Sequence, residues 1–204
     1  YRELEEILGI PSSLLAKYVK GSIVPSYERA LKLMKLIAEE NMERKILNKV
    51  LVRDEYGFIN IRDALGDPHI IRLLAYKFIL EKPNFNKVLS VDIDSMPLSS
   101  MIAALTNTTL VTVTKTKEVG LGNYAEETYY TDSPPFVITL YMPKGVIQRG
   151  DRLLVICNVL RTGRTLEALV RLVERMGGKV TKVLVVASIG HEWIRRLKNI
   201  HDKI

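Results

Sequence analysis

The sequence has 204 residues, of which 47% are hydrophobic and 26% charged, a composition typical of a globular protein with a sizeable core. Its single cysteine, Cys157, excludes an internal disulfide and favours a reducing compartment, so we expect a cytoplasmic protein. No secretory signal and no apolar run of membrane-spanning length is recognisable, and we expect no membrane association. The formal charge of +7 favours polyanionic partners such as nucleic acid or phosphorylated ligands.

The positive charge is unevenly distributed along the chain. Residues 1–60 hold ten Lys and Arg against nine Asp and Glu, whereas residues 149–204 hold twelve against five. Any contact of the N-terminal part with DNA would therefore depend on a few well-placed cations.

Short apolar faces at helical spacing predict three helices within residues 1–45. The first ends before Gly9, the second runs from Ser12 to Lys20, and the third follows Pro25 with Ser26 as its N-cap. Gly9 allows a turn with positive φ, and Pro11 suits the first turn of a helix. This pattern fits a helix-turn-helix, although packing helices of an all-α cap, such as a dimerisation arm, would share it.

In a helix-turn-helix the second helix would lie in the major groove of double-stranded DNA. We expect the DNA contacts to come from its early residues and from the residues just beyond it: Ser12, Ser13, Lys17, Lys20 and Ser22. Residues 4–40, with their Gly-x-x-x-Pro-Ser linker at 21–26, resemble the Cro/repressor (Xre-type) helix-turn-helix family. The resemblance covers about a fifth of the chain and implies a DNA-binding domain over residues 1–45 that acts as a homodimer. The family's earlier helix is expected to precede Tyr1.

Residues 46–204 are predicted to form a second, α/β domain. It would begin with a β-hairpin, in which 46–52 and 58–61 flank a turn at 53–57, followed by a helix from Pro68 to about Leu80. Apolar strands are then predicted at 88–93, 110–114, 136–141, 153–157 and 180–187, with helices at 97–105 and 165–176. Residues 116–134 lack a period and suggest a long mobile loop or a frayed hairpin. This alternation predicts a parallel sheet flanked by helices.

The strand near 153–157 continues through Val159 and Leu160 into residues 161–165, which we call the phosphate loop, and then directly into a helix. The unpaired N–H groups and the dipole of a helix N-terminus attract anions. The loop adds two arginines and two hydroxyls, so its five residues are the predicted phosphate ligands: Arg161, Thr162, Gly163, Arg164 and Thr165. An ordinary strand-to-helix turn is the alternative. The Gly-Lys-Ser/Thr of a triphosphate site is absent.

This stretch resembles the 5-phosphoribosyl-1-pyrophosphate (PRPP) motif of type I phosphoribosyltransferases, in which an apolar strand, two acidic residues and a Thr-Gly-x-Thr-like loop follow one another. The stretches 88–105 and 110–120 resemble the family's pyrophosphate loop and its flexible active-site loop, so the likeness spans roughly residues 68–190. It implies PRPP or a nucleoside monophosphate as effector, Mg²⁺ if PRPP binds, and no other required cofactor. Its pyrophosphate-binding residues would be Asp94, Ser95, Lys115 and Lys117, although a solvated strand end would also explain the two lysines.

The chain departs from that family at the acidic pair, where Cys157 and Asn158 stand. The resemblance implies that the two carboxylates of the family's acidic pair hold the ribose hydroxyls and stabilise the positive charge of the transition state. Asn158 can still bind a ribose hydroxyl, but neither residue supplies that charge. Asp94, where an anion would approach, favours a nucleoside monophosphate over PRPP. We therefore expect binding without catalysis, with no catalytic residues.

Three functions fit these features. The leading hypothesis is a transcription regulator that senses PRPP or a nucleoside monophosphate, similar in plan to the purine repressor type of bacteria and to archaeal fusions of a helix-turn-helix with a phosphoribosyltransferase domain. The second is an active purine or orotate phosphoribosyltransferase with an accessory helical domain. The third is an RNA-binding or protein-interaction module.

His69, His191 and His201 lack metal-ligand spacing, so no metal site is expected.

Overall fold

The computed structural model describes residues 5, 6, 8–39, 42–52, 55, 59–118, 120, 122–131 and 134–204. The chain divides into two units, Tyr1–Asn60 and Ile61–Ile204. This division lies beyond the domain boundary predicted at residues 45 and 46, because residues 42–50 form a helix of the first unit and not part of a hairpin.

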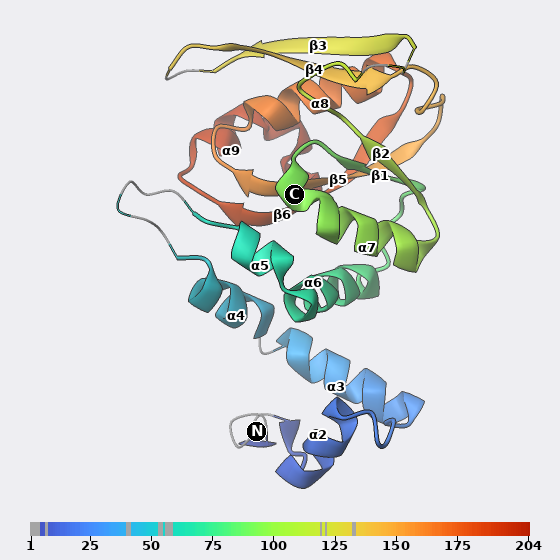
Figure 1. Ribbon diagram of the computed structural model, residues 1–204, viewed down its shortest axis with the longest axis vertical. Coiled ribbons are helices and arrows are strands. Elements are labelled where there is room, and N and C mark those ends of the chain that lie inside the picture. Colours follow the sequence, from blue (N-terminus) through green and yellow to red (C-terminus); the bar gives the residue numbers. More distant parts are fainter. Residues whose placement is uncertain are drawn as a thin grey trace. The chain divides into compact units, whose positions relative to one another are not determined.

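The regular elements described in the first unit are helices. It contains α2 (Ser12–Val19), α3 (Tyr27–Glu39) and α4 (Met42–Val50), all shown in Figure 1. The predicted second and third helices are confirmed, and the Ser26 hydroxyl accepts a hydrogen bond from the Arg29 amide at 3.4 Å, as an N-cap does.

The prediction of a strand at residues 46–52, as the first arm of a hairpin, is wrong. Ile46, Leu47, Val50 and Leu51 recur at helical spacing and α4 carries most of them, so the apolar run at 46–52 belongs to one face of a helix. The turn at 53–57 and Phe58 lie largely outside the described residues.

The second unit is built on a four-stranded sheet in the order β2-β1-β5-β6. Its strands are β1 (Lys87–Ser90), β2 (Thr109–Thr112), β5 (Arg152–Leu160) and β6 (Lys179–Ser188). Every pairing in this sheet is parallel, which confirms the prediction. The carboxyl ends of the strands meet at one edge, and β1 and β5 lie side by side in the middle. The loops that follow these two strands are therefore neighbours, at the edge where open α/β sheets bind ligands.

Helices cover both faces of this sheet (Figure 1). One face carries α5 (Arg62–Gly66), α6 (Pro68–Leu80) and α7 (Met96–Thr106), and the other carries α8 (Arg164–Arg175). The predicted helices of this unit are confirmed, including the start of α6, where the Asp67 carboxylate accepts the His69 amide at 2.7 Å. The unit also contains short helical segments: η1 (Ile93–Ser95), α9 (Glu192–Arg196) and η2 (Lys198–Lys203).

A two-stranded antiparallel sheet lies over α8. It pairs β3 (Tyr124–Tyr130) with β4 (Val137–Pro143). The residues expected to form a mobile loop or frayed hairpin thus contain a regular strand. The Glu127 carboxylate on β3 fixes this sheet to α8, because it accepts hydrogen bonds from Arg171 Nε and Arg175 Nη1, each at 2.8 Å.

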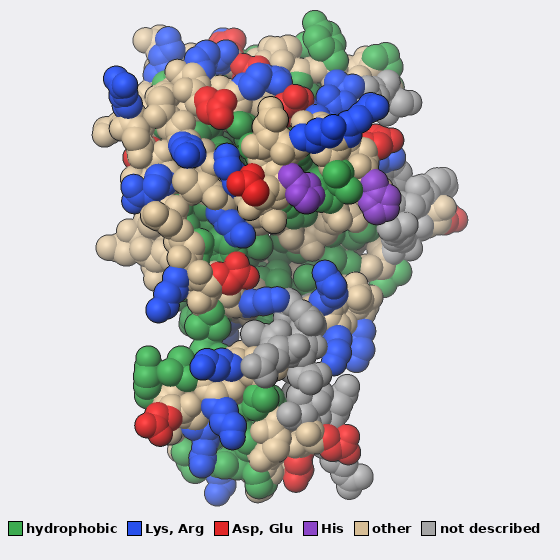
Figure 2. Space-filling model, turned by 180° about the vertical axis from the view of Figure 1, so that it is seen from behind, with side chains coloured by type: hydrophobic (Ala, Val, Ile, Leu, Met, Phe, Trp, Pro, Cys, Tyr) green, Lys and Arg blue, Asp and Glu red, His purple; other side chains and the backbone are tan. Residues whose placement is uncertain are grey.

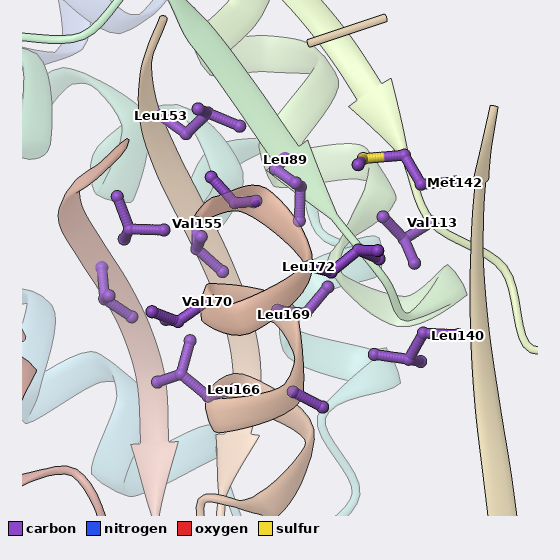
Figure 3. Close-up of a cluster of buried hydrophobic side chains, with 14 of the residues drawn as sticks. Leu89, Val113, Leu140, Met142, Leu153, Val155, Leu166, Leu169, Val170 and Leu172 are labelled. Atoms are coloured by element: carbon purple, nitrogen blue, oxygen red, sulfur yellow. The ribbon is translucent and has the colours of Figure 1, made fainter. Parts of the chain in front are cut away.

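The core of the second unit surrounds α8. Figure 3 shows the leucines of α8 directed on one side towards the parallel sheet and on the other towards Leu140 and Met142 of β4. Leu89, Leu153, Leu166, Leu169 and Leu172 are all at most 2% exposed. Among the described residues, no helix is long and apolar enough to cross a membrane, and no cluster of three or more potential metal ligands occurs.

Gly178 allows the turn after α8 to lie directly on this core. A Cβ at this position would lie 2.8 Å from Ile147 Cγ2 and from Leu153 Cδ1, and both side chains are buried. We expect Gly178→Ala to lower the free energy of unfolding by about 1–3 kcal/mol through overpacking. Thermal denaturation checks this against Gly66→Ala, where the new methyl group would meet no atom within 4 Å. Equal melting temperatures for the two variants would contradict it.

Candidate functional site

The phosphate loop joins the end of β5 to the start of α8. Gly163 is the N-cap of α8 and has φ +78°, a conformation that glycine adopts readily. Its carbonyl accepts the Glu167 amide at 2.9 Å, so the helix begins immediately after it. The amides of the first helical turn therefore have no acceptor within the helix, as the predicted anion site requires.

A cavity of about 110 Å³ opens beside this loop. Its walls come from the ends of β1 and β5, from the phosphate loop and from the first turns of α8. The lining residues that bear on ligand binding are Asp92, Cys157 and all five residues of the phosphate loop, Arg161 to Thr165. The structure thus brings the predicted phosphate ligands together at one cavity.

The C-terminal segment, residues 192–204, packs against the loop. A Cβ on Gly163 would lie 3.0 Å from Leu197 Cγ and 3.3 Å from Trp193 Cβ. Arg196 Nε donates to the Thr162 carbonyl at 3.0 Å. The Trp193 ring is stacked on His201, with 5.8 Å between the ring centroids. These contacts hold the shape of the loop. Sequence reasoning missed them because β6 and most of α8 separate the loop from α9 along the chain.

Tyr129 is a further residue that sequence reasoning missed. This buried side chain on β3 shares a hydrogen bond of 2.7 Å with the Thr165 hydroxyl. It therefore positions one of the predicted phosphate ligands. On β3, Ala125 and Tyr129 are both buried, whereas Glu126, Thr128 and Tyr130 are exposed. The polar residues of the strand obscured this alternation in the sequence.

The positions of the expected acidic pair hold no negative charge. Cys157 lines the cavity, and burial together with the nearby Asp92 charge raises the pKa of its thiol to about 12. The thiol is therefore neutral at physiological pH. Asn158 Oδ1 accepts the Val159 amide at 2.6 Å, and Asn158 is not among the described residues that line this cavity.

The loop between β1 and α7, residues 91–95, contributes two carboxylates, each paired with a cation. Asp92 lines the cavity and its Oδ1 lies 3.0 Å from Lys115 Nζ. Asp94 Oδ1 lies 2.9 Å from Arg62 Nε, a partner on α5 that the sequence did not indicate. Burial alone would lower the pKa of Lys115, but the adjacent Asp92 raises it above its ordinary value, so this lysine stays charged.

Ser95 and Lys117, the other two residues predicted to bind pyrophosphate, have partners within the protein. Ser95 is fully buried, and its hydroxyl bonds to the Ser90 hydroxyl at 2.7 Å and to the Asp92 carbonyl at 2.8 Å. Lys117 Nζ lies 2.7 Å from Glu126 Oε1 and 5.2 Å from the centre of the Tyr141 ring. The structure therefore places neither of them on the cavity described above.

In the first unit, Ser13, Lys17, Lys20 and Ser22 are all exposed. Ser13 and Lys17 lie one turn apart on α2 and so share a face. Ser12 differs, because its amide and its hydroxyl both bind the Glu5 carboxylate, which lowers the pKa of that carboxyl group. Gly9 has φ +60°, as the predicted turn requires. The face of the whole chain drawn in Figure 2 shows more Lys and Arg than Asp and Glu side chains.

No protein-family model matches the chain. Among curated proteins it is 29% identical to the hypoxanthine/guanine phosphoribosyltransferase of Methanopyrus kandleri over 125 residues, which cover 60% of this chain and 64% of that protein. It is 22% identical to the purine biosynthesis transcriptional repressor PurR of Bacillus subtilis over 132 residues, which cover 64% of this chain and 46% of that protein. The chain thus spans less than two thirds of the length of either relative.

Among solved structures, the adenine phosphoribosyltransferase of Rhodothermus marinus matches with a TM-score of 0.66 and 25% identity, over 76% of this chain and 92% of that one. The adenine phosphoribosyltransferase of Trypanosoma brucei matches with a TM-score of 0.67 and 19% identity, over 79% and 74% of the two chains. The parallel sheet and its flanking helices agree with these matches. The chain has a type I phosphoribosyltransferase-like fold, as the phosphate-loop motif predicted.

Proposed function

We propose that the protein binds a 5-phosphorylated ribose at the phosphate loop, does not transfer it, and regulates transcription through its N-terminal helices. One observation carries this proposal. The phosphate loop lines a cavity in which a neutral thiol, Cys157, stands where the motif that this stretch resembles has a carboxylate.

The loop is suited to a phosphate monoester. The amides at the start of α8 and the positive end of its dipole favour an anion at this place. Arg161 and Arg164 line the same cavity, and charge-assisted hydrogen bonds from arginine to phosphate are among the stronger polar contacts. The ligand would enter at the carboxyl edge of the sheet.

Phosphoribosyl transfer would develop positive charge on the ribose, and an enzyme stabilises such charge with preorganised groups of opposite sign. Loss of one such electrostatic group typically lowers the turnover rate by about 10²–10³-fold. Neither Cys157 nor Asn158 supplies a negative charge here. This favours a sensor over a transferase.

The regulator half of the proposal rests on the first unit. Exposed polar and cationic side chains lie on α2 and on the turn after it, where a recognition helix would contact DNA. The match to a purine biosynthesis repressor supports the same role. One short helix reads few base pairs, so we infer a homodimer that binds two half-sites.

An active purine phosphoribosyltransferase is the second candidate, and the comparisons favour it at least as strongly. The matched relatives include hypoxanthine/guanine and adenine phosphoribosyltransferases. Asp92 also places one carboxylate on the cavity. Release of pyrophosphate from PRPP with adenine, guanine or hypoxanthine distinguishes the two candidates, because a sensor releases none above the rate without protein.

Lys17→Ala tests the regulator half. We expect weaker binding to genomic DNA fragments and a salt dependence that is shallower by about one ion, because one phosphate contact is lost. Gel shifts at several salt concentrations, with and without PRPP and purine nucleoside monophosphates, measure both effects. Lys49→Ala, an exposed lysine on α4, is the matched control and should change neither. Failure of the wild-type protein to bind any fragment selectively would end the regulator proposal.

A further inference from the structure

We propose that Asp92 binds the ribose hydroxyls in place of the missing acidic pair, and that the cavity therefore selects a ribose 5-phosphate with an uncharged substituent at C1. Such ligands are purine nucleoside monophosphates and ribose 5-phosphate itself, and PRPP is disfavoured. This inference rests on the proposed binding of phosphate at residues 161–165.

Asp92 is the carboxylate that the fold directs to this cavity. It follows β1, which pairs with β5 so that Ser90 lies opposite Ile156, one residue before Cys157. Asp92 and Cys157 line the same cavity, and the side chain of Asp92 is only 26% exposed. The charge of Asp92 contributes to the raised pKa of Cys157, which places the two groups within electrostatic reach.

The chemistry of Asp92 fits a pair of hydroxyl donors. An ionised carboxylate has about four acceptor positions, and the ion pair with Lys115 uses Oδ1. The ion pair with Lys115 Nζ at 3.0 Å fixes the orientation of the Asp92 carboxylate. The cavity thus has an anion-binding end at the phosphate loop and a hydroxyl-accepting end at Asp92, which is the arrangement that a 5-phosphorylated ribose requires.

The same loop disfavours a pyrophosphate at C1. Asp92 and Asp94 both lie in residues 91–95, the stretch that resembles the pyrophosphate loop of the transferases. The two cations nearest to them, Lys115 and Arg62, already pair with these carboxylates at 3.0 and 2.9 Å. A pyrophosphate would therefore approach two negative charges whose countercharges are already engaged, whereas a neutral base would meet no such repulsion.

Calorimetric titration of the full chain tests this, with AMP, GMP, ribose 5-phosphate, PRPP and inorganic pyrophosphate, each with and without Mg²⁺. We expect at least one monophosphate or ribose 5-phosphate to bind at least tenfold more tightly than PRPP, and pyrophosphate not to bind. Comparison of the affinities for AMP and GMP with the affinity for ribose 5-phosphate shows whether the base contributes to binding.

Two variants separate the roles of the carboxylates. Asp92→Asn should lower the affinity for the best ligand at least tenfold and leave the affinity for inorganic phosphate unchanged. Asp94→Asn should shift the preference towards PRPP by at least threefold. Glu81→Gln, an exposed carboxylate at the end of α6, is the control and should alter neither.

This inference would be overturned if PRPP bound more tightly than AMP, GMP and ribose 5-phosphate, or if Asp92→Asn left the affinity for the best ligand unchanged. Either result would leave the proposed ribose-phosphate site in place. No binding of any ribose phosphate would instead end the proposed function. If Asp92→Asn does not fold, the order of affinities of the wild-type protein still decides.

Discussion

Gly163→Val is expected to abolish binding of every ribose phosphate, with a loss of affinity of at least about 100-fold. Gly163 has φ +78°, and a side chain there would lie 3.0 Å from Leu197 Cγ and 3.3 Å from Trp193 Cβ. A non-glycine residue in this conformation costs about 1–2 kcal/mol before any steric clash. Because α8 begins directly after this residue, relief of the strain would displace the amides at the proposed phosphate site.

Calorimetric titration with AMP, GMP and ribose 5-phosphate measures the loss. The matched control is Gly145→Val, at a glycine with φ +88° where an added Cβ would meet no atom within 4 Å. It carries the same backbone strain away from the cavity, so it should lower the melting temperature but preserve binding. If Gly163→Val retained wild-type affinity, the phosphate loop would not be the binding site.

Cys157→Asp is expected to destabilise the protein in a pH-dependent manner. The environment that raises the pKa of the Cys157 thiol to about 12 disfavours any anion, and the Asp92 charge adds repulsion. The new carboxyl group would therefore have a folded-state pKa above its ordinary value of about 4. Each unit of difference corresponds to about 1.4 kcal/mol, and we expect a loss of about 3 kcal/mol at neutral pH.

The sign of this effect follows from linkage. Below about pH 4 the carboxyl group is protonated in both states, and Cys157→Asp should be nearly as stable as the wild type. As the pH rises towards the folded-state pKa, only the unfolded chain ionises freely, and the free energy of unfolding falls. Urea denaturation at several pH values, with Cys157→Ser as the neutral control, measures this. A variant whose stability stays parallel to the control, and which gains turnover, would show that the cavity accepts a second carboxylate.

Much of the second unit followed from local sequence signals. The boundaries of α6, α7 and α8 and the parallel order of β1, β5 and β6 agree with periodicity and with the cap residues, such as Asp67. Two elements did not follow. The apolar residues of α4 also fit a short strand, and β3 holds Glu126, Glu127 and Thr128, whose partners lie on other elements or beyond the hairpin turn.

The site shows the same division between local and distant signals. The phosphate loop was predictable because its glycine, hydroxyls and arginines are consecutive. The pairing of Asp94 with Arg62, the bond of Tyr129 to Thr165 and the packing of Leu197 on Gly163 all join residues distant in sequence. Asp92 was likewise visible only when β1 and β5 were placed side by side.

Equilibrium dialysis of labelled AMP or GMP against the protein, in the presence of Mg²⁺ and pyrophosphate, tests the central claim most directly. A transferase would convert the nucleotide and pyrophosphate into the free base and PRPP. We predict that the protein retains the nucleotide and that all of it is recovered intact. Appearance of free adenine or guanine, or failure of the protein to retain either nucleotide, would contradict a ribose-phosphate site that binds without reaction.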